Sequence, residues 1–193
     1  MSIPFDECFE VWWRAEWDRE PPGSASPAHL ADVTVVCFGE NPGAEGEITI
    51  ADEGEVLDLV RGGAGFGLES DATGEWTIFR TPKVALEVSL EVLRRARATG
   101  RERFAGLQRG AVDVVVHGHE ISVSGPAREG AEQLVRHSRP GELLLPGLVA
   151  SEKDVAQSIT RLGRLSRTET LLLSGAGIPA PVFALVPARN TSP

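Results

Sequence analysis

The sequence predicts an α+β fold in which helices pack on a mostly antiparallel sheet. Residues 31–38 and 111–116 are short, apolar and rich in β-branched side chains, which is typical of buried strands. An amphipathic helix begins at Pro82, because apolar residues recur every three or four positions after it. Predicted strand pairs alternate with single helices along the chain, an order that favours a sheet covered on one face by helices.

The elements follow one another from residue 31 with turn residues between them. After the first strand come a loop rich in glycine and proline, a short strand and a short helix, at 39–46, 48–50 and 52–61. Polar residues at 71–75 separate two apolar segments and predict a hairpin, 66–70 with 76–79. The helix that begins at Pro82 ends at Gly100.

The second half repeats this alternation. A tight turn at 117–119 joins the strand at 111–116 to a second strand at 120–124. Gly125-Pro126 opens a helix to about residue 136, and Pro140-Gly141 leads into a strand at 142–145. Ser151 and Asp154 are typical of a helix start. Apolar segments at 168–173 and 182–186 predict the last two strands.

Composition excludes several classes of function. The chain has 193 residues, of which 41% are hydrophobic, and a formal net charge of -9. An acidic chain is a poor partner for nucleic acid or an anionic membrane. No apolar run is long enough to span a bilayer, and the acidic N-terminal residues lack the basic start of a signal peptide. Cys8 and Cys37 do not make a disulfide framework, so we expect a cytoplasmic protein.

The chain is predicted to have four parts. Residues 1–19 form an amphipathic helix, 20–30 a linker rich in proline, glycine and serine, 31–187 the main domain, and 188–193 a tail. The helix carries an aromatic stripe that packs either on the protein's own core or against a protein partner or second copy. The stripe consists of Phe5, Phe9, Trp12, Trp13 and Trp17.

Three other motifs favour structural interpretations. The glycine-rich bend at 62–67 lacks the GK[ST] of a phosphate-binding loop. His117 and His119 lie two apart at a strand end without an evident third metal ligand. A basic run is either a solvated helix end or a patch for an anion or an acidic partner. Its members are Arg94, Arg95, Arg97, Arg101 and Arg103.

Several segments, in this order, resemble the catalytic domain of class III nucleotidyl cyclases. They are residues 34–40 (TVVCFGE), 73–79 (TGEWTIF), 114–120 (VVVHGHE), 125–134 with 140–145 (PGELLL), and 177–183 (GIPAPVF). The resemblance covers about residues 31–187 and implies a ferredoxin-like sandwich. It also implies an active site between two subunits, and therefore a homodimer. In this family two aspartates hold two divalent ions, which activate the ribose hydroxyl and bind the triphosphate.

The sequence departs from this family at the positions that carry its chemistry. The two metal-binding aspartates correspond to Glu40 and Glu75, and the base-recognising lysine corresponds to Asp71. The helical asparagine and arginine that stabilise the transition state correspond to Glu129 and Gln133. Four acids in such a pocket repel a triphosphate, and the longer glutamates misplace their carboxylates for Mg²⁺.

These departures predict a catalytically degenerate cyclase-like domain. We expect it to act as a dimeric regulatory or signalling module that binds a ligand or protein, with no catalytic residues, no metal and no cofactor. The N-terminal helix is a candidate surface for a protein partner. The alternative is an active or weakly active adenylate or guanylate cyclase. In that case Glu40 and Glu75 would hold Mg²⁺ or Mn²⁺.

Overall fold

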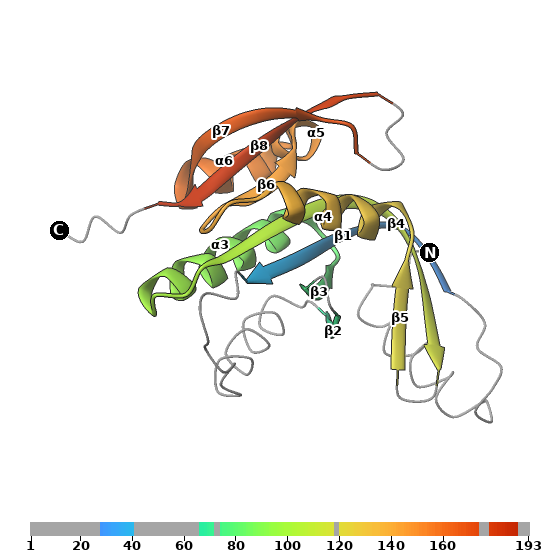
Figure 1. Ribbon diagram of the computed structural model, residues 1–193. Helices are drawn as coiled ribbons and strands as arrows, with labels where there is room; N and C mark the ends of the chain where they lie inside the picture. Colours follow the sequence, from blue (N-terminus) through green and yellow to red (C-terminus); the bar gives the residue numbers. More distant parts are fainter. Residues whose placement is uncertain (1–27, 41–65, 72–73, 118–119, 174–177, 189–193) are drawn as a thin grey trace.

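The computed structural model describes residues 28–40, 66–71, 74–117, 120–173 and 178–188. Within these ranges eight strands form one mixed sheet in the order β2-β3-β1-β4-β6-β8-β7, and β5 pairs with β4 (Figure 1). Only β4 and β6 run parallel among the described pairs. The strands are β1 Ala28–Glu40, β2 Phe66–Asp71, β3 Gly74–Phe79, β4 Arg103–His117, β5 Glu120–Ser124, β6 Leu143–Pro146, β7 Gly163–Leu171 and β8 Ala180–Pro187.

Helices cover both faces of this sheet, whereas the sequence analysis predicted one. The described helices are α3 Pro82–Ala98, α4 Pro126–His137, α5 Gly147–Ala150 and α6 Lys153–Leu162. Apolar residues of α3, α5 and α6 pack with Val36 and Phe38 of β1. Residues of α4 pack with Val35 and Cys37, on the opposite face (Figure 1). Consecutive apolar residues in β1 therefore belong to two cores, which explains why the strand does not alternate.

The strand β4 begins eight residues earlier than predicted. Glycines and polar residues at 106–110 concealed its first half. Gly106 faces α4, and a Cβ there would lie 2.4 Å from the Ala131 carbonyl oxygen. The side chains of Ala105 and Leu107 are buried in the other core. The glycine therefore permits close helix packing and does not mark a loop.

Other boundaries differ at the ends of the chain's elements. β1 begins at Ala28, so the last residues of the predicted linker 20–30 belong to the strand. β7 begins at Gly163 and not at 168, because an edge strand has little buried surface to mark it. The short helix α5 was not predicted.

Some predicted features lie outside the described residues. These are the aromatic helix 1–19, the elements at 48–61, and most of the bend at 62–67. Among the described helices, none is long and apolar enough to cross a membrane.

Candidate functional site

Glu40 ends β1, where the cyclase resemblance places a metal ligand. In the sheet it pairs with Arg103, the first residue of β4. Its Oε1 lies 3.2 Å from Nε of Arg101, and its Oε2 lies 3.3 Å from Nε of Arg103. The side chain of Arg103 is 4% exposed, while that of Glu40 is 31% exposed. Each oxygen of this carboxylate therefore faces a guanidinium.

Glu75 is the second residue of β3, the strand next to β1. Glu75 pairs with Phe38 of β1, and Glu40 lies two residues after Phe38 on that strand. Asp71 pairs with Gly74 at the end of the β2–β3 hairpin. The backbone thus places Glu40, Asp71 and Glu75 near one end of three adjacent strands. The side chains of Asp71 and Glu75 lie outside the described part of the structure, as do those of His117 and His119.

The two residues that the resemblance assigns to transition-state positions, Glu129 and Gln133, lie on α4. Glu129 is in the first turn of this helix and is exposed to solvent. Gln133 lies one turn later, on the same side of the helix. Its Nε2 donates a hydrogen bond of 2.6 Å to the carbonyl oxygen of Leu172, just beyond β7. The two predicted positions therefore hold an exposed acid and an amide that is hydrogen-bonded to the backbone.

Arg128 and Trp76 form a contact that was not predicted from the sequence. The guanidinium of Arg128 lies 4.7 Å from the centroid of the indole ring, a cation–π geometry. The same side chain donates to the carbonyl oxygen of Val123 and lies 3.3 Å from Glu132. The Trp76 ring is 3% exposed, and its Nε1 has no hydrogen-bond partner. In the sequence, the only indication of this contact is that Trp76 lies in a short apolar strand directly after Glu75.

Four arginines of the basic run, in the last turns of α3 and just beyond it, contact two acids. Arg94 binds Glu91 through two hydrogen bonds of 2.6 and 2.5 Å, and Arg95 adds a third of 2.8 Å. These contacts lower the pKa of Glu91 to about 2, chiefly through the hydrogen bonds from Arg94. Arg101 and Arg103 contact Glu40 instead. The run is therefore more than a solvated helix end, because four of its arginines each contact a defined carboxylate.

The described surface also has an ion-pair network at Arg109 and a small cavity. Arg109 donates to both carboxylate oxygens of Asp32 at 2.6 Å and to Glu152 at 2.8 Å, and these bonds raise the pKa of Arg109. A cavity of about 170 Å³ opens between α3, α6 and the end of β8, and its charged lining includes Glu87 and Arg161. Those two side chains bond to each other at 2.8 Å. Within the described ranges, no cluster of three or more His, Cys, Asp or Glu side chains could hold a metal ion.

Solved structures of cyclase domains share this fold. An adenylate/guanylate cyclase/hydrolase from Silicibacter pomeroyi aligns with a TM-score of 0.66 and 14% identity, covering 84% of this chain and 100% of that one. The adenylyl cyclase CyaB from P. aeruginosa aligns with a TM-score of 0.64 and 14% identity, over 87% and 100% of the two chains. A dimeric guanylyl cyclase domain of the RhoGC fusion protein from Blastocladiella emersonii gives 0.61 and 12%, over 86% and 100%.

These alignments establish the fold of a class III nucleotidyl cyclase catalytic domain. They confirm the α+β, antiparallel-rich sheet with packed helices that the sequence resemblance implied. No protein-family model matches the sequence, and no curated protein matches it.

Proposed function

We propose that this chain is a non-catalytic domain of the nucleotidyl cyclase fold, which acts as a regulatory module by binding a protein or ligand. The pairing of Glu40 with Arg101 and Arg103 carries the proposal. A divalent ion at this carboxylate has to displace two guanidinium groups, one of them on a side chain that is 4% exposed. The two cations already neutralise the carboxylate, so the residues present do not fit a Mg²⁺ site.

The α4 positions support the same conclusion. Phosphoryl chemistry needs positive charge directed at the phosphates. Glu129 brings a negative charge, and the Gln133 amide donates to the Leu172 carbonyl. Arg128 is adjacent to Glu129 in sequence, but it lies over Trp76 and contacts Glu132. These contacts direct its charge toward the protein's own groups.

The second candidate is an active or weakly active metal-dependent cyclase. It is favoured by the backbone pairing that brings Glu40 and Glu75 to neighbouring strands two residues apart in register. For this function, Glu40 would have to exchange its arginine partners for a metal ion. The proposal and its alternative therefore make opposite statements about the same carboxylate.

Metal binding and turnover distinguish the two candidates. We expect the protein to form no cyclic nucleotide from ATP or GTP with Mn²⁺, and Mn²⁺ to leave its melting temperature unchanged. The matched variants are Glu40→Gln, at the candidate site, and Asp154→Asn, an exposed acid on α6. Product that requires Mn²⁺, disappears in Glu40→Gln and persists in Asp154→Asn would establish the cyclase alternative. A Mn²⁺-dependent rise in melting temperature lost in Glu40→Gln alone would refute the absence of a metal site.

We also propose that the domain forms a homodimer. One solved cyclase domain with this fold is dimeric, and burial of a sheet face between subunits does not require catalytic residues. Sedimentation at micromolar concentration should give about twice the chain mass of 20.6 kDa. A single species at the monomer mass across that range would contradict the proposal.

A further inference from the structure

The cavity between α3, α6 and the end of β8 is a candidate binding site for a small molecule. Both helices lie on the same face of the sheet (Figure 1). The volume of about 170 Å³ is below the range of about 300–1,000 Å³ that is usual for drug-sized ligands. The cavity therefore suits a molecule smaller than a nucleotide. Its lining shares no residue with the contacts of Glu40, so it is a separate place on the molecule.

Part of the cavity lining is apolar. Leu90 of α3 is 2% exposed, and Leu162 at the end of α6 packs against the same core. Pro187 ends β8 and also lines the cavity. The Ala188 N–H donates to the Leu162 carbonyl at 2.9 Å, which holds the end of β8 against α6. Such a surface favours a small aliphatic group, because binding releases water from both.

An acid and a base line the cavity side by side. Oε1 of Glu87 accepts hydrogen bonds from Arg161 Nη2 at 2.8 Å and from Ser158 Oγ at 2.7 Å. Ser158 is 2% exposed, so it anchors the carboxylate from the protein interior. Within the described residues, Oε2 of Glu87 accepts no hydrogen bond and Nη1 of Arg161 donates none. Each group therefore retains hydrogen-bonding capacity for a ligand.

The other acid of the cavity lining differs in this respect. Oε2 of Glu91 accepts from Arg94 at 2.6 Å, and its Oε1 accepts from Arg94 at 2.5 Å and from Arg95 at 2.8 Å. Both of its oxygens thus already have cationic partners. The contact between Glu87 and Arg161 is therefore the place where a charged ligand fits.

We propose that this cavity binds a free α-amino acid with a small aliphatic side chain, such as leucine. The ammonium and carboxylate of an α-amino acid are attached to one carbon, so they match an acid and a base that are 2.8 Å apart. The ammonium donates to Glu87 and the carboxylate accepts from Arg161, both in charge-assisted hydrogen bonds. The aliphatic side chain lies against Leu90, Leu162 and Pro187. This inference does not depend on the absence of catalysis at Glu40.

Thermal melting of the full chain with L-leucine tests the proposal. Millimolar L-leucine should raise the melting temperature, because a ligand that binds only the folded state stabilises it. Leucinamide keeps the ammonium and lacks the carboxylate, as the N-terminus of a peptide does. N-acetyl-leucine keeps the carboxylate and lacks the ammonium, as a peptide's C-terminus does. Both analogues should raise the melting temperature less than leucine. No rise with leucine, or an equal rise with either analogue, would overturn the proposal.

Arg161→Gln and Arg164→Gln are matched variants for locating the site. Arg161 lines the cavity and is 66% exposed, while Arg164 is an exposed arginine of β7 outside the lining. Loss of a hydrogen bond to the ligand carboxylate should weaken leucine binding about tenfold in Arg161→Gln, measured by titration calorimetry. Arg164→Gln should bind leucine as the wild type does. Equal weakening in the two variants, or unchanged binding in Arg161→Gln, would mean that leucine does not occupy this cavity.

Glu87→Gln tests the contact with the ligand ammonium. The amide keeps an oxygen that accepts from Ser158 and removes only the negative charge. It should weaken leucine binding about tenfold, whereas Asp154→Asn, at an exposed acid on α6, should leave it unchanged. Wild-type affinity in Glu87→Gln would contradict the assignment of the ammonium to this carboxylate and overturn the proposal.

Discussion

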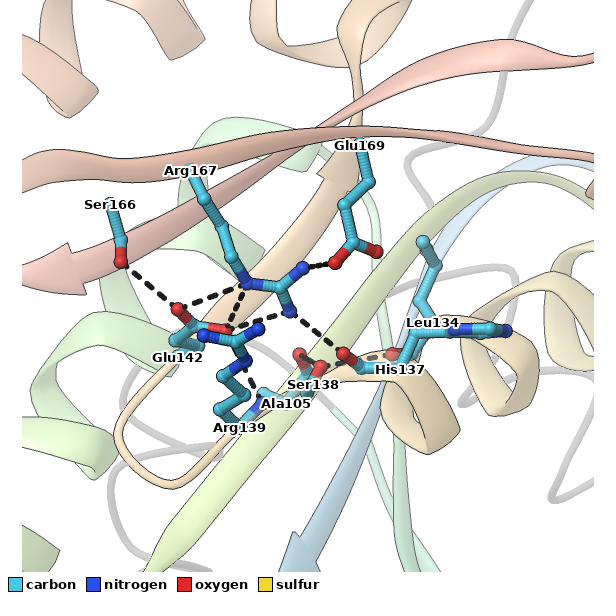
Figure 2. A network of polar contacts seen from close by, with 9 residues as sticks. All are labelled: Ala105, Leu134, His137, Ser138, Arg139, Glu142, Ser166, Arg167 and Glu169. Atoms are coloured by element: carbon cyan, nitrogen blue, oxygen red, sulfur yellow. Dashed lines mark hydrogen bonds and ion pairs between the residues drawn. The ribbon is translucent and has the colours of Figure 1, made fainter.

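Two carboxylates flank the first residues of β4, and the protein surrounds them to different extents. On the β6 side, the side chain of Glu142 is 6% exposed and accepts hydrogen bonds from Ser166 Oγ at 3.0 Å, Arg167 Nε at 3.0 Å and the Arg139 backbone N–H at 3.3 Å (Figure 2). On the β1 side, the side chain of Glu40 is 31% exposed and contacts Arg101 and Arg103 at 3.2 and 3.3 Å.

The backbone explains why these neighbours differ. The Ala105 N–H donates to the Glu142 carbonyl at 2.9 Å, and the Gly141 N–H donates to the Arg103 carbonyl at 2.7 Å, so hydrogen bonds to β4 fix the backbone of Glu142 just before β6 begins. Glu40 is the last residue of its strand and pairs with the first residue of β4. The buried carboxylate of Glu142 links neighbouring segments of the fold, whereas that of Glu40, at a strand end, remains partly open to solvent. Contacts between glutamate and arginine therefore differ in burial at the two places.

The largest expected effect comes from Glu142→Ala. It removes the acceptor for Ser166 and leaves Arg167, whose side chain is 15% exposed, without its most buried partner. Loss of one member of a buried pair should reduce the free energy of unfolding by about 3 kcal/mol, measured by urea denaturation.

Glu169→Ala is the control, because Glu169 pairs with the same Arg167 but is 33% exposed on an edge strand. Its loss should be under about 1 kcal/mol. Equal losses in the two variants would show that burial does not set the strength of this network.

The next effect is at the Glu40 site. Glu40→Gln should lower the free energy of unfolding by about 1 kcal/mol, because solvent screens a partly exposed carboxylate. Arg103→Gln should cost more than Arg101→Gln, since the Arg103 side chain is 4% exposed and that of Arg101 is 19% exposed. Urea midpoints of the three variants measure this order. A loss in Glu40→Gln as large as that in Glu142→Ala would remove the distinction between the two carboxylates.

The sequence predicts more of the fold than of the contacts at these sites. Periodicity and turn residues predicted α3, α4 and the β2–β3 hairpin near their observed bounds, and the family resemblance predicted the sheet architecture. The first half of β4 escaped prediction because residues 106–110 lack an apolar, β-branched pattern, and the need for glycine at Gly106 comes from the helix that packs on it. The roles assigned to Asp71, Glu75, Glu129 and Gln133 stay predictions. Arg101 and Arg103 were known only as a basic run, since their pairing with Glu40 needs contact between segments about 60 residues apart.

The smallest expected effect extends the comparison to a carboxylate on a helix surface. Glu91 is 30% exposed, like Glu40, but its hydrogen bonds to Arg94 and Arg95 come from its own helix. They lower its pKa from 4.5 to about 2. A lowered pKa in the folded state contributes stability above pH 4.5, and this contribution declines as the pH falls toward 2.

Glu91→Gln should therefore destabilise the protein at pH 7 by about 0.5 kcal/mol, with the difference vanishing near pH 2. Urea midpoints of the two proteins from pH 7 to pH 2 measure it. In an Arg94→Gln background the same substitution should have less effect at pH 7. A difference that persists unchanged at pH 2 would mean that Glu91 stabilises α3 through packing and not through its charge.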